Sequence, residues 1–270
     1  MIDAHCHLDA DGLPVSADEA IAEAAAVGVT GIVMAGVDRA GWATQQAIAA
    51  RHPGRVFPVF GVHPQVVAEL SERALEAELA ALETAVRDAR RAGPAATVAP
   101  VALGEVGLDF LTPERKAQAG LQERAMRAQL QLARALALPV VLHLLRADEP
   151  ALRILRSEGL PPAGGLVHSF SGAREFAKML VNLGLSLSFC GTLTFPQSRR
   201  LREAATWVPE DRVLIETDSP YQPPEGHRGH ANRPAQLPDV ARALGALRGW
   251  SPEETGARTA ANARRLFGLA

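Results

Sequence analysis

The sequence predicts an α/β fold, most simply a TIM (β/α)8 barrel with an extra C-terminal helix, in which residues 1–270 form a single domain. Three observations favour this fold. The chain has 270 residues, close to the roughly 250 that such a barrel uses. Short apolar runs alternate along the whole chain with longer segments of helical period. No linker or change in composition marks a domain boundary.

The apolar runs, which are rich in valine, leucine and isoleucine, are expected to form the strands. Their hydrophobicity is continuous rather than alternating, as is typical of strands buried on both faces of a parallel sheet. An open, doubly wound sheet would use the same elements and is the alternative arrangement. The eight expected strands are 2–5, 30–35, 56–62, 101–104, 140–143, 165–168, 185–189 and 213–217.

The segments between these runs are expected to form helices. Ser71 is a predicted N-cap, and Gly28, Gly159 and Gly184 lie where helices should end. Residues 92–100 are expected to form a loop. The expected helices are 17–26, 40–51, 72–91, 115–136, 150–157, 173–183, 196–207 and 234–247, followed by the extra helix 252–267.

Composition excludes several classes of protein. A net charge of −2, from 28 basic and 30 acidic residues, excludes a broadly basic nucleic-acid-binding surface. Aromatic residues make up only 4% of the chain, too few for a long base-stacking track. Two cysteines exclude a disulfide framework. No membrane span, signal peptide or obligate protein partner is evident, so we expect a cytoplasmic protein.

Five of the eight histidines fall at the ends of expected strands. In a (β/α)8 barrel the active site lies at the C-terminal ends of the strands. Two carboxylates, Glu105 and Asp218, also fall at such ends. A single buried histidine is usually a structural residue, but this concentration indicates a metal site. The histidines are His5, His7, His63, His143 and His168.

The geometry of a β-strand explains why the spacing of these histidines suits metal binding. Side chains alternate along a strand, so His5 and His7 point to the same side and can chelate one divalent ion, which Asp218 can complete. Glu105 has two oxygens and could bridge two ions. His143 and His168, on neighbouring strands, could hold the second. Such ligand sets suit Zn²⁺ or Mn²⁺, and carboxylate-rich, water-filled ones suit Mg²⁺.

On these motifs the sequence resembles the TatD family of metal-dependent deoxyribonucleases, within the amidohydrolase-like superfamily. The resemblance runs over essentially the whole chain, and the order of its motifs is highly specific. The motifs are Asp3-Ala4-His5-Cys6-His7-Leu8-Asp9, Gly61-Val62-His63-Pro64, Gly104-Glu105-Val106-Gly107-Leu108-Asp109, Leu138-Pro139-Val140-Val141-Leu142-His143, His168-Ser169-Phe170-Ser171-Gly172, Glu216-Thr217-Asp218-Ser219-Pro220-Tyr221 and Asn262-Ala263-Arg264-Arg265-Leu266-Phe267.

The resemblance implies two divalent ions and hydrolysis of DNA that is single-stranded or attacked at its ends. It places His63 near the substrate. It implies that one ion is held by His5, His7, Glu105 and Asp218, and the other by Glu105, His143 and His168.

The sequence departs from the family pattern at the rim of the expected site. Where the family usually has Ser-Arg-Asp-Ala after the histidine of the fifth strand, this chain has Leu144-Leu145-Arg146-Ala147. After the eighth strand, His230 and Arg233 replace the usual lysine and glutamate. Arg146 and Arg228 follow ligand-bearing strands and are the expected phosphate contacts. These departures therefore bear on which substrate is bound rather than on whether hydrolysis occurs.

Asp218 is the expected catalytic residue that orients water and takes its proton, with Glu105 as the catalytic bridge between ions roughly 3.5–4 Å apart. A carbonyl hydrolase acting on an ester or amide, such as aminoacyl-tRNA or a small lactone, would use the same activated water and is the alternative. A non-catalytic metal-binding protein would be expected to lack a ligand. Asp3 and Glu216 are interpreted as structural, and Asp109 as either a loop cap or a partner of the ligands.

Overall fold

The structure, a computed structural model, describes residues 1–93 and 98–270. It contains two compact units, each assembled from separate stretches of chain. The terminal unit comprises Met1–Met34, His52–Val56 and His168–Ala270, and the central unit comprises Ala35–Arg51 and Phe57–Val167. Among the described helices, none combines the length and the apolar character needed to cross a membrane.

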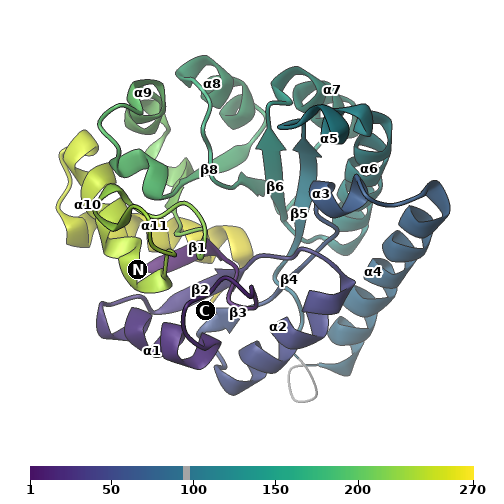
Figure 1. Ribbon diagram of the computed structural model, residues 1–270, viewed down its shortest axis with the longest axis horizontal. Helices are drawn as coiled ribbons and strands as arrows, with labels where there is room; N and C mark the ends of the chain where they lie inside the picture. Colours follow the sequence, from purple (N-terminus) through teal and green to yellow (C-terminus); the bar gives the residue numbers. More distant parts are fainter. Residues whose placement is uncertain (94–97) are drawn as a thin grey trace. The chain divides into compact units, whose positions relative to one another are not determined.

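The central unit contains four parallel strands that pair in sequence order, β4 with β5, β5 with β6 and β6 with β7. Figure 1 shows β5 and β6 side by side, with α6 packed against β5. The strands are β4 (Val59–Phe60), β5 (Ala102–Asp109), β6 (Val140–Leu145) and β7 (Gly165–Val167). The helices are α2 (Arg39–Arg51), α3 (Pro64–Val67), α4 (Glu72–Ala92), α5 (Pro113–Ala117), α6 (Ala119–Leu136) and α7 (Asp148–Glu158).

The terminal unit holds two parallel strand pairs, β1 with β2 and β8 with β9. Helix α11 packs against β1, β9 and α10, which brings the two ends of the chain into one unit (Figure 1). The strands are β1 (Ile2–Cys6), β2 (Gly31–Met34), β8 (Leu185–Phe189) and β9 (Val213–Ile215). The helices are α1 (Ala17–Ala26), α8 (Arg174–Asn182), α9 (Arg199–Trp207), α10 (Leu237–Arg248) and α11 (Pro252–Phe267), with 3-10 turns η1 (Gly191–Thr194), η2 (Glu210–Arg212), η3 (Glu225–His227) and η4 (Pro234–Gln236).

Two predicted elements are interrupted. The expected strand 56–62 is divided into β3 (Val56–Phe57), which straddles the unit boundary, and β4, with Pro58 between them. Proline has no N–H to donate to a neighbouring strand. The expected helix 115–136 is divided at Gln118, where the backbone leaves the helical region and α5 gives way to α6.

Other helices and strands begin or end at residues different from those predicted. Strand β5 continues to Asp109, five residues beyond the predicted end, and every residue in it is buried. The expected helix 196–207 begins only at Arg199, after the 3-10 turn η1. Helix α4 continues to Ala92 and ends at Gly93, and residues 94–97 of the expected loop lie outside the described residues.

The predicted helix caps are present where the structure describes them. The Ser71 hydroxyl accepts a hydrogen bond from the N–H of Ala74 at the start of α4. Gly28, Gly159 and Gly184 have φ values of 86°, 70° and 98°, which suits glycine at the ends of helices. The extra C-terminal helix, α11, has the predicted bounds.

Candidate metal centre

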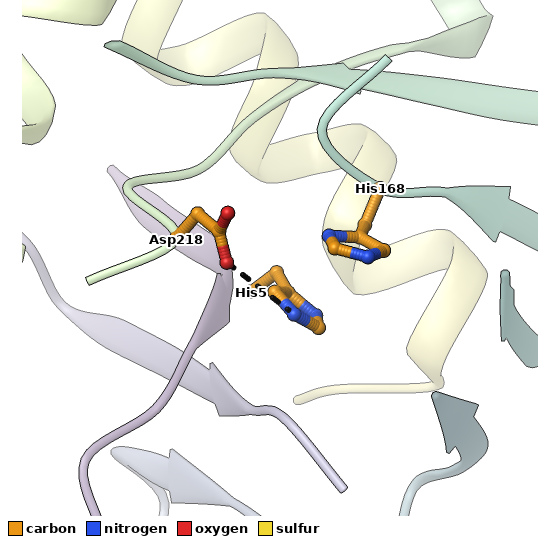
Figure 2. A group of neighbouring side chains, drawn as sticks. All are labelled: His5, His168 and Asp218. Carbon is orange, nitrogen blue, oxygen red and sulfur yellow. Dashed lines mark ion pairs between the residues drawn. The ribbon is translucent and has the colours of Figure 1, made fainter. Parts of the chain in front are cut away.

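In the terminal unit, the ends of β1 and β9 are joined by backbone hydrogen bonds. The N–H of Asp218 donates to the carbonyl of His5 at 3.0 Å, and the N–H of His7 donates to that of Ser219 at 2.8 Å. These bonds bring the Asp218 carboxylate to the two imidazoles that the spacing of β1 predicted. Its Oδ1 lies 3.8 Å from Nε2 of His5 (Figure 2). The same atom lies 3.4 Å from Nε2 of His7.

His168 completes this group. Its ring stacks on that of His5, with the centroids 4.0 Å apart. One nitrogen from each imidazole and one oxygen of Asp218 all lie within 4.8 Å of one another, and the three residues are buried (Figure 2). Imidazole nitrogen with carboxylate oxygen is a donor set that suits Zn²⁺, Mn²⁺ and similar ions. The residues present therefore fit a divalent metal.

The surroundings of Asp218 favour its ionised form. Burial by itself would raise the pKa of this carboxyl group, but a hydrogen bond from His7 and the nearby imidazoles His168 and His5 outweigh it and lower the pKa. The Asp218 backbone has a φ of 57°. Such left-handed conformations are uncommon outside glycine and cluster at functional sites.

Glu216 orients His168. The carboxylate is buried, accepts hydrogen bonds from the N–H of Ser169 at 2.6 Å and from the Ser188 hydroxyl, and lies 3.7 Å from Nδ1 of His168. A carboxylate on one imidazole nitrogen fixes the ring and leaves the other nitrogen, here Nε2, for a metal. Glu216 was interpreted as structural, and its carboxylate, 3.7 Å from Nδ1 of His168, is placed to hold that ring.

Replacing Glu216 with glutamine should therefore lower the affinity for Mn²⁺ by about 10- to 100-fold, since the carboxylate that holds the ligand ring is lost. Isothermal titration with Mn²⁺ measures the change. Glu203→Gln, on an exposed residue of α9 in the same unit, is the matched control and should retain wild-type affinity. Equal affinities for the two variants would show that Glu216 has no such role.

The central unit brings together His63, Glu105 and His143. The Glu105 Oε2 atom lies 3.5 Å from Nε2 of His63 and 3.4 Å from Nδ1 of His143. One donor atom from each of the three residues falls within 4.8 Å of the others, and Glu105 is buried. This second group also combines imidazole and carboxylate donors and fits a divalent ion.

Asp109 lies beside His143 much as Glu216 lies beside His168, but it faces Nε2 of the ring rather than Nδ1. Its Oδ2 lies 3.6 Å from Nε2 of His143 and accepts hydrogen bonds at 2.8 Å from Gln65 and Arg115. Burial would raise the pKa of Asp109, but hydrogen bonds from His143, the N–H of Leu111 and Gln65 hold it well below its usual range. The geometry fits both expected roles, because Oδ1 accepts the N–H of Leu111 at 2.9 Å and caps the loop while Oδ2 faces His143. Nδ1 of His143 is left beside Glu105.

His63 is suited to donating a hydrogen bond. Its Nδ1 accepts the N–H of Gln65 at 3.0 Å and caps α3. A neutral imidazole that accepts at Nδ1 carries its proton on Nε2, the nitrogen that faces Glu105 and His143. The family resemblance placed His63 near the substrate, whereas the structure groups its ring with Glu105 and His143.

Glycines allow the close backbone contacts beneath Glu105 and His143. The N–H of Glu105 donates to the carbonyl of Gly36, and a Cβ added to Gly36 would lie 2.0 Å from the carbonyl oxygen of Gly104. A Cβ on Gly107 would lie 1.9 Å from the carbonyl oxygen of His143. Any side chain at these positions would displace the segments that carry the candidate ligands.

The rim residues lie outside the ligand groups. Arg146 is exposed and donates to the carbonyl of Leu111 at 3.4 Å. Arg228 is exposed, and its guanidinium lies 4.5 Å from the centre of the Phe195 ring. Arg233, one of the departures from the family pattern, forms an ion pair with Glu23 of α1 at 3.0 Å, which gives it a structural partner.

Comparison with known proteins finds the same family that the sequence motifs resemble. The family described as TatD related DNase matches residues 2–268. The metal-dependent hydrolase YcfH of Escherichia coli is 37% identical over 99% of this chain and 95% of its own length. The Erwinia billingiae protein named 3'-5' ssDNA/RNA exonuclease TatD is 34% identical, over 100% of this chain and 99% of its own. The crystal structure of the TatD homologue YjjV from Escherichia coli matches with a TM-score of 0.87 and 32% identity, covering 100% of this chain and 98% of YjjV.

The chain is a metal-dependent hydrolase. This class is defined by the two histidine–carboxylate groups together with the similarity to these relatives. The chain belongs to the TatD-related DNase family. The likeness to YjjV over the whole chain confirms the predicted fold class.

Proposed function

We propose that this protein is a deoxyribonuclease that hydrolyses phosphodiester bonds of single-stranded DNA or DNA ends with two divalent metal ions. The observation that carries the proposal is the pair of largely buried histidine–carboxylate groups, one in each unit, at the ends of β-strands. The name of the Erwinia relative, a ssDNA/RNA exonuclease, supports a nucleic acid as the substrate class.

We propose six metal ligands and a single hydrolase domain over residues 1–270. His5, His7, Glu105 and Asp218 would hold one ion, and Glu105, His143 and His168 the other, as Zn²⁺, Mn²⁺ or Mg²⁺. The unbroken family match over residues 2–268 supports one domain. The stacking of His168 on His5 and its proximity to Asp218 also make His168 a candidate for the ion held by the terminal unit.

Bound metal would polarise the phosphate and lower the pKa of a water molecule so that hydroxide forms near neutral pH. The residues of the chain supply orientation and proton transfer. Asp218 stays ionised at neutral pH although it is buried, because His7 and the other nearby imidazoles offset the effect of burial on its pKa. An ionised carboxylate can accept the proton of the attacking water. Glu216 and Asp109 hold His168 and His143 in place while this occurs.

Substrate contacts would come from the rim and from His63. Arg146 and Arg228 are exposed guanidinium groups that can each contact a phosphate. His63 faces Glu105 through Nε2 and would lie near the reacting group. With a net charge of −2, few phosphates would be contacted beyond these.

One feature of the rim supports the alternative function, hydrolysis of a carbonyl ester or amide. Leu144 and Leu145 end β6 directly after His143 and are partly exposed, so they offer an apolar surface beside a candidate ligand. An apolar surface suits the side chain of an aminoacyl ester or a small lactone better than a phosphate. This candidate shares the metal ligands and differs only in the bond that is cleaved.

A direct comparison of substrates separates the two functions. We expect the protein, with Mn²⁺ or Mg²⁺, to degrade single-stranded DNA labelled at its 3' end faster than it deacylates a misacylated tRNA. Asp218→Ala is the control for contaminating nucleases. DNA cleavage no greater than that of Asp218→Ala would reject the deoxyribonuclease, and rapid deacylation would support the alternative.

A further inference from the structure

We propose that Gln222 is a positioning residue that determines which oxygen of Asp218 faces the metal-binding imidazoles. The inference rests on the proposed role of Asp218 as a metal ligand and adds a residue that lies outside the candidate ligand groups. Gln222 follows Asp218 by four residues, on the segment after β9, and is partly buried.

The Gln222 amide forms hydrogen bonds at both of its ends. Nε2 donates to Oδ2 of Asp218 at 2.7 Å and also to the hydroxyl of Ser169. Oε1 accepts from the Cys190 thiol at 3.3 Å. An ionised carboxylate can only accept hydrogen bonds, so the nitrogen of the amide must be the end that faces Asp218. This chemistry fixes the orientation of the side chain.

The backbone of Gln222 is held as firmly as its side chain. It has a φ of 48°, and the N–H of Tyr221 donates to the carbonyl of Asp218 at 2.8 Å to form a turn. The buried Asn232 amide donates to the carbonyls of Tyr221 and Gln222 at 2.8 and 3.3 Å. On the other side, a Cβ on Gly191 would lie only 2.1 Å from the carbonyl oxygen of Gln222.

The two oxygens of Asp218 therefore have different neighbours. Oδ2 accepts the hydrogen bond from Gln222, whereas Oδ1 lies 3.4 and 3.8 Å from the Nε2 atoms of His7 and His5. A carboxylate held in this way would bind a metal through Oδ1 alone. Catalytic metal sites keep one coordination position open for water or substrate. Gln222 would preserve that position by preventing Asp218 from binding through both oxygens.

The test uses Co²⁺, whose visible absorption reports its coordination number. Gln222→Met keeps the length of the side chain but removes the N–H donor, so Asp218 can rotate and bind through both oxygens. We expect a weaker, shifted absorption band for the Co²⁺-loaded variant and a Co²⁺ affinity about 10-fold lower, typical for loss of a residue that orients a ligand. Gln222→Asn, which cannot reach as far and tolerates a positive φ, should show the same change.

The matched control is Gln131→Met, because Gln131 also donates to a carboxylate, that of Glu158 at 3.0 Å, but on an exposed surface. It should keep the wild-type spectrum and affinity. If both Gln222 variants retain the wild-type spectrum, the positioning role is rejected. Asp218→Asn separates this result from failure of the proposed function: if that variant also leaves the Co²⁺ spectrum unchanged, Asp218 is not a ligand and both proposals fall.

Discussion

Replacing Asp218 with asparagine is expected to lower the rate of DNA hydrolysis by about 10³-fold, within the range typical of a positioned acid–base group. Asparagine has nearly the same size, but it is neutral and cannot take a proton from water. It also removes the negative charge beside His5 and His7. Single-turnover hydrolysis of 3'-labelled single-stranded DNA, with Mn²⁺ in excess, measures the effect on the reaction rather than on product release.

Asp211→Asn is the matched control, since Asp211 is an exposed aspartate of the same unit that precedes β9. Its rate should equal that of the wild type. Circular dichroism of both variants would show whether their folds are intact. A folded Asp218→Asn variant that cleaves DNA at the wild-type rate would contradict the proposed role of Asp218.

Replacing Glu105 with glutamine is expected to remove bound metal. Glu105 is the carboxylate in the group formed with His63 and His143, and it is the proposed bridge between the ions. A neutral amide is a poor ligand for a divalent cation and cannot bridge two of them. The metal content, measured by plasma mass spectrometry after dialysis, should fall from roughly two ions per chain, as in two-metal sites, to about one or fewer.

Glu83→Gln provides the comparison, because Glu83 is exposed on α4 in the same unit and pairs only with Arg87 in the contacts described for it. It should retain the wild-type metal content. If Glu105→Gln also binds the wild-type number of ions, Glu105 is not the bridge, although it could still contact a single ion.

Much of the secondary structure could be predicted from the sequence because residues with strong local preferences, such as capping serines, mark where helices and strands begin or end. Strand β8 and helices α1 and α11 have the predicted bounds. Serines cap α1 and α11 at their first turns, and each forms a capping box with a glutamate. Where the prediction failed, as at Pro58 and Gln118, a single residue interrupts an otherwise continuous apolar or helical pattern.

The candidate ligands could be predicted because strand ends in parallel sheets place their residues on one edge. Which ligand each partner faces could not be predicted. Asp109 was one of the expected partners, but Asp109 and Glu216 lie far from His143 and His168 in sequence, and only the fold brings each pair together. The role of Gln222 depends on a left-handed backbone and on Asn232, and neither feature has a sequence pattern of its own.

The most direct test of the account is the position of bound metal in crystals grown with Mn²⁺. Anomalous scattering at the manganese edge locates each ion independently of the protein density. We expect peaks within coordination distance of His5, His7 and Asp218, and of Glu105 and His143. Ordered manganese found only at other residues, or no peak beside these ligands at saturating Mn²⁺, would contradict it.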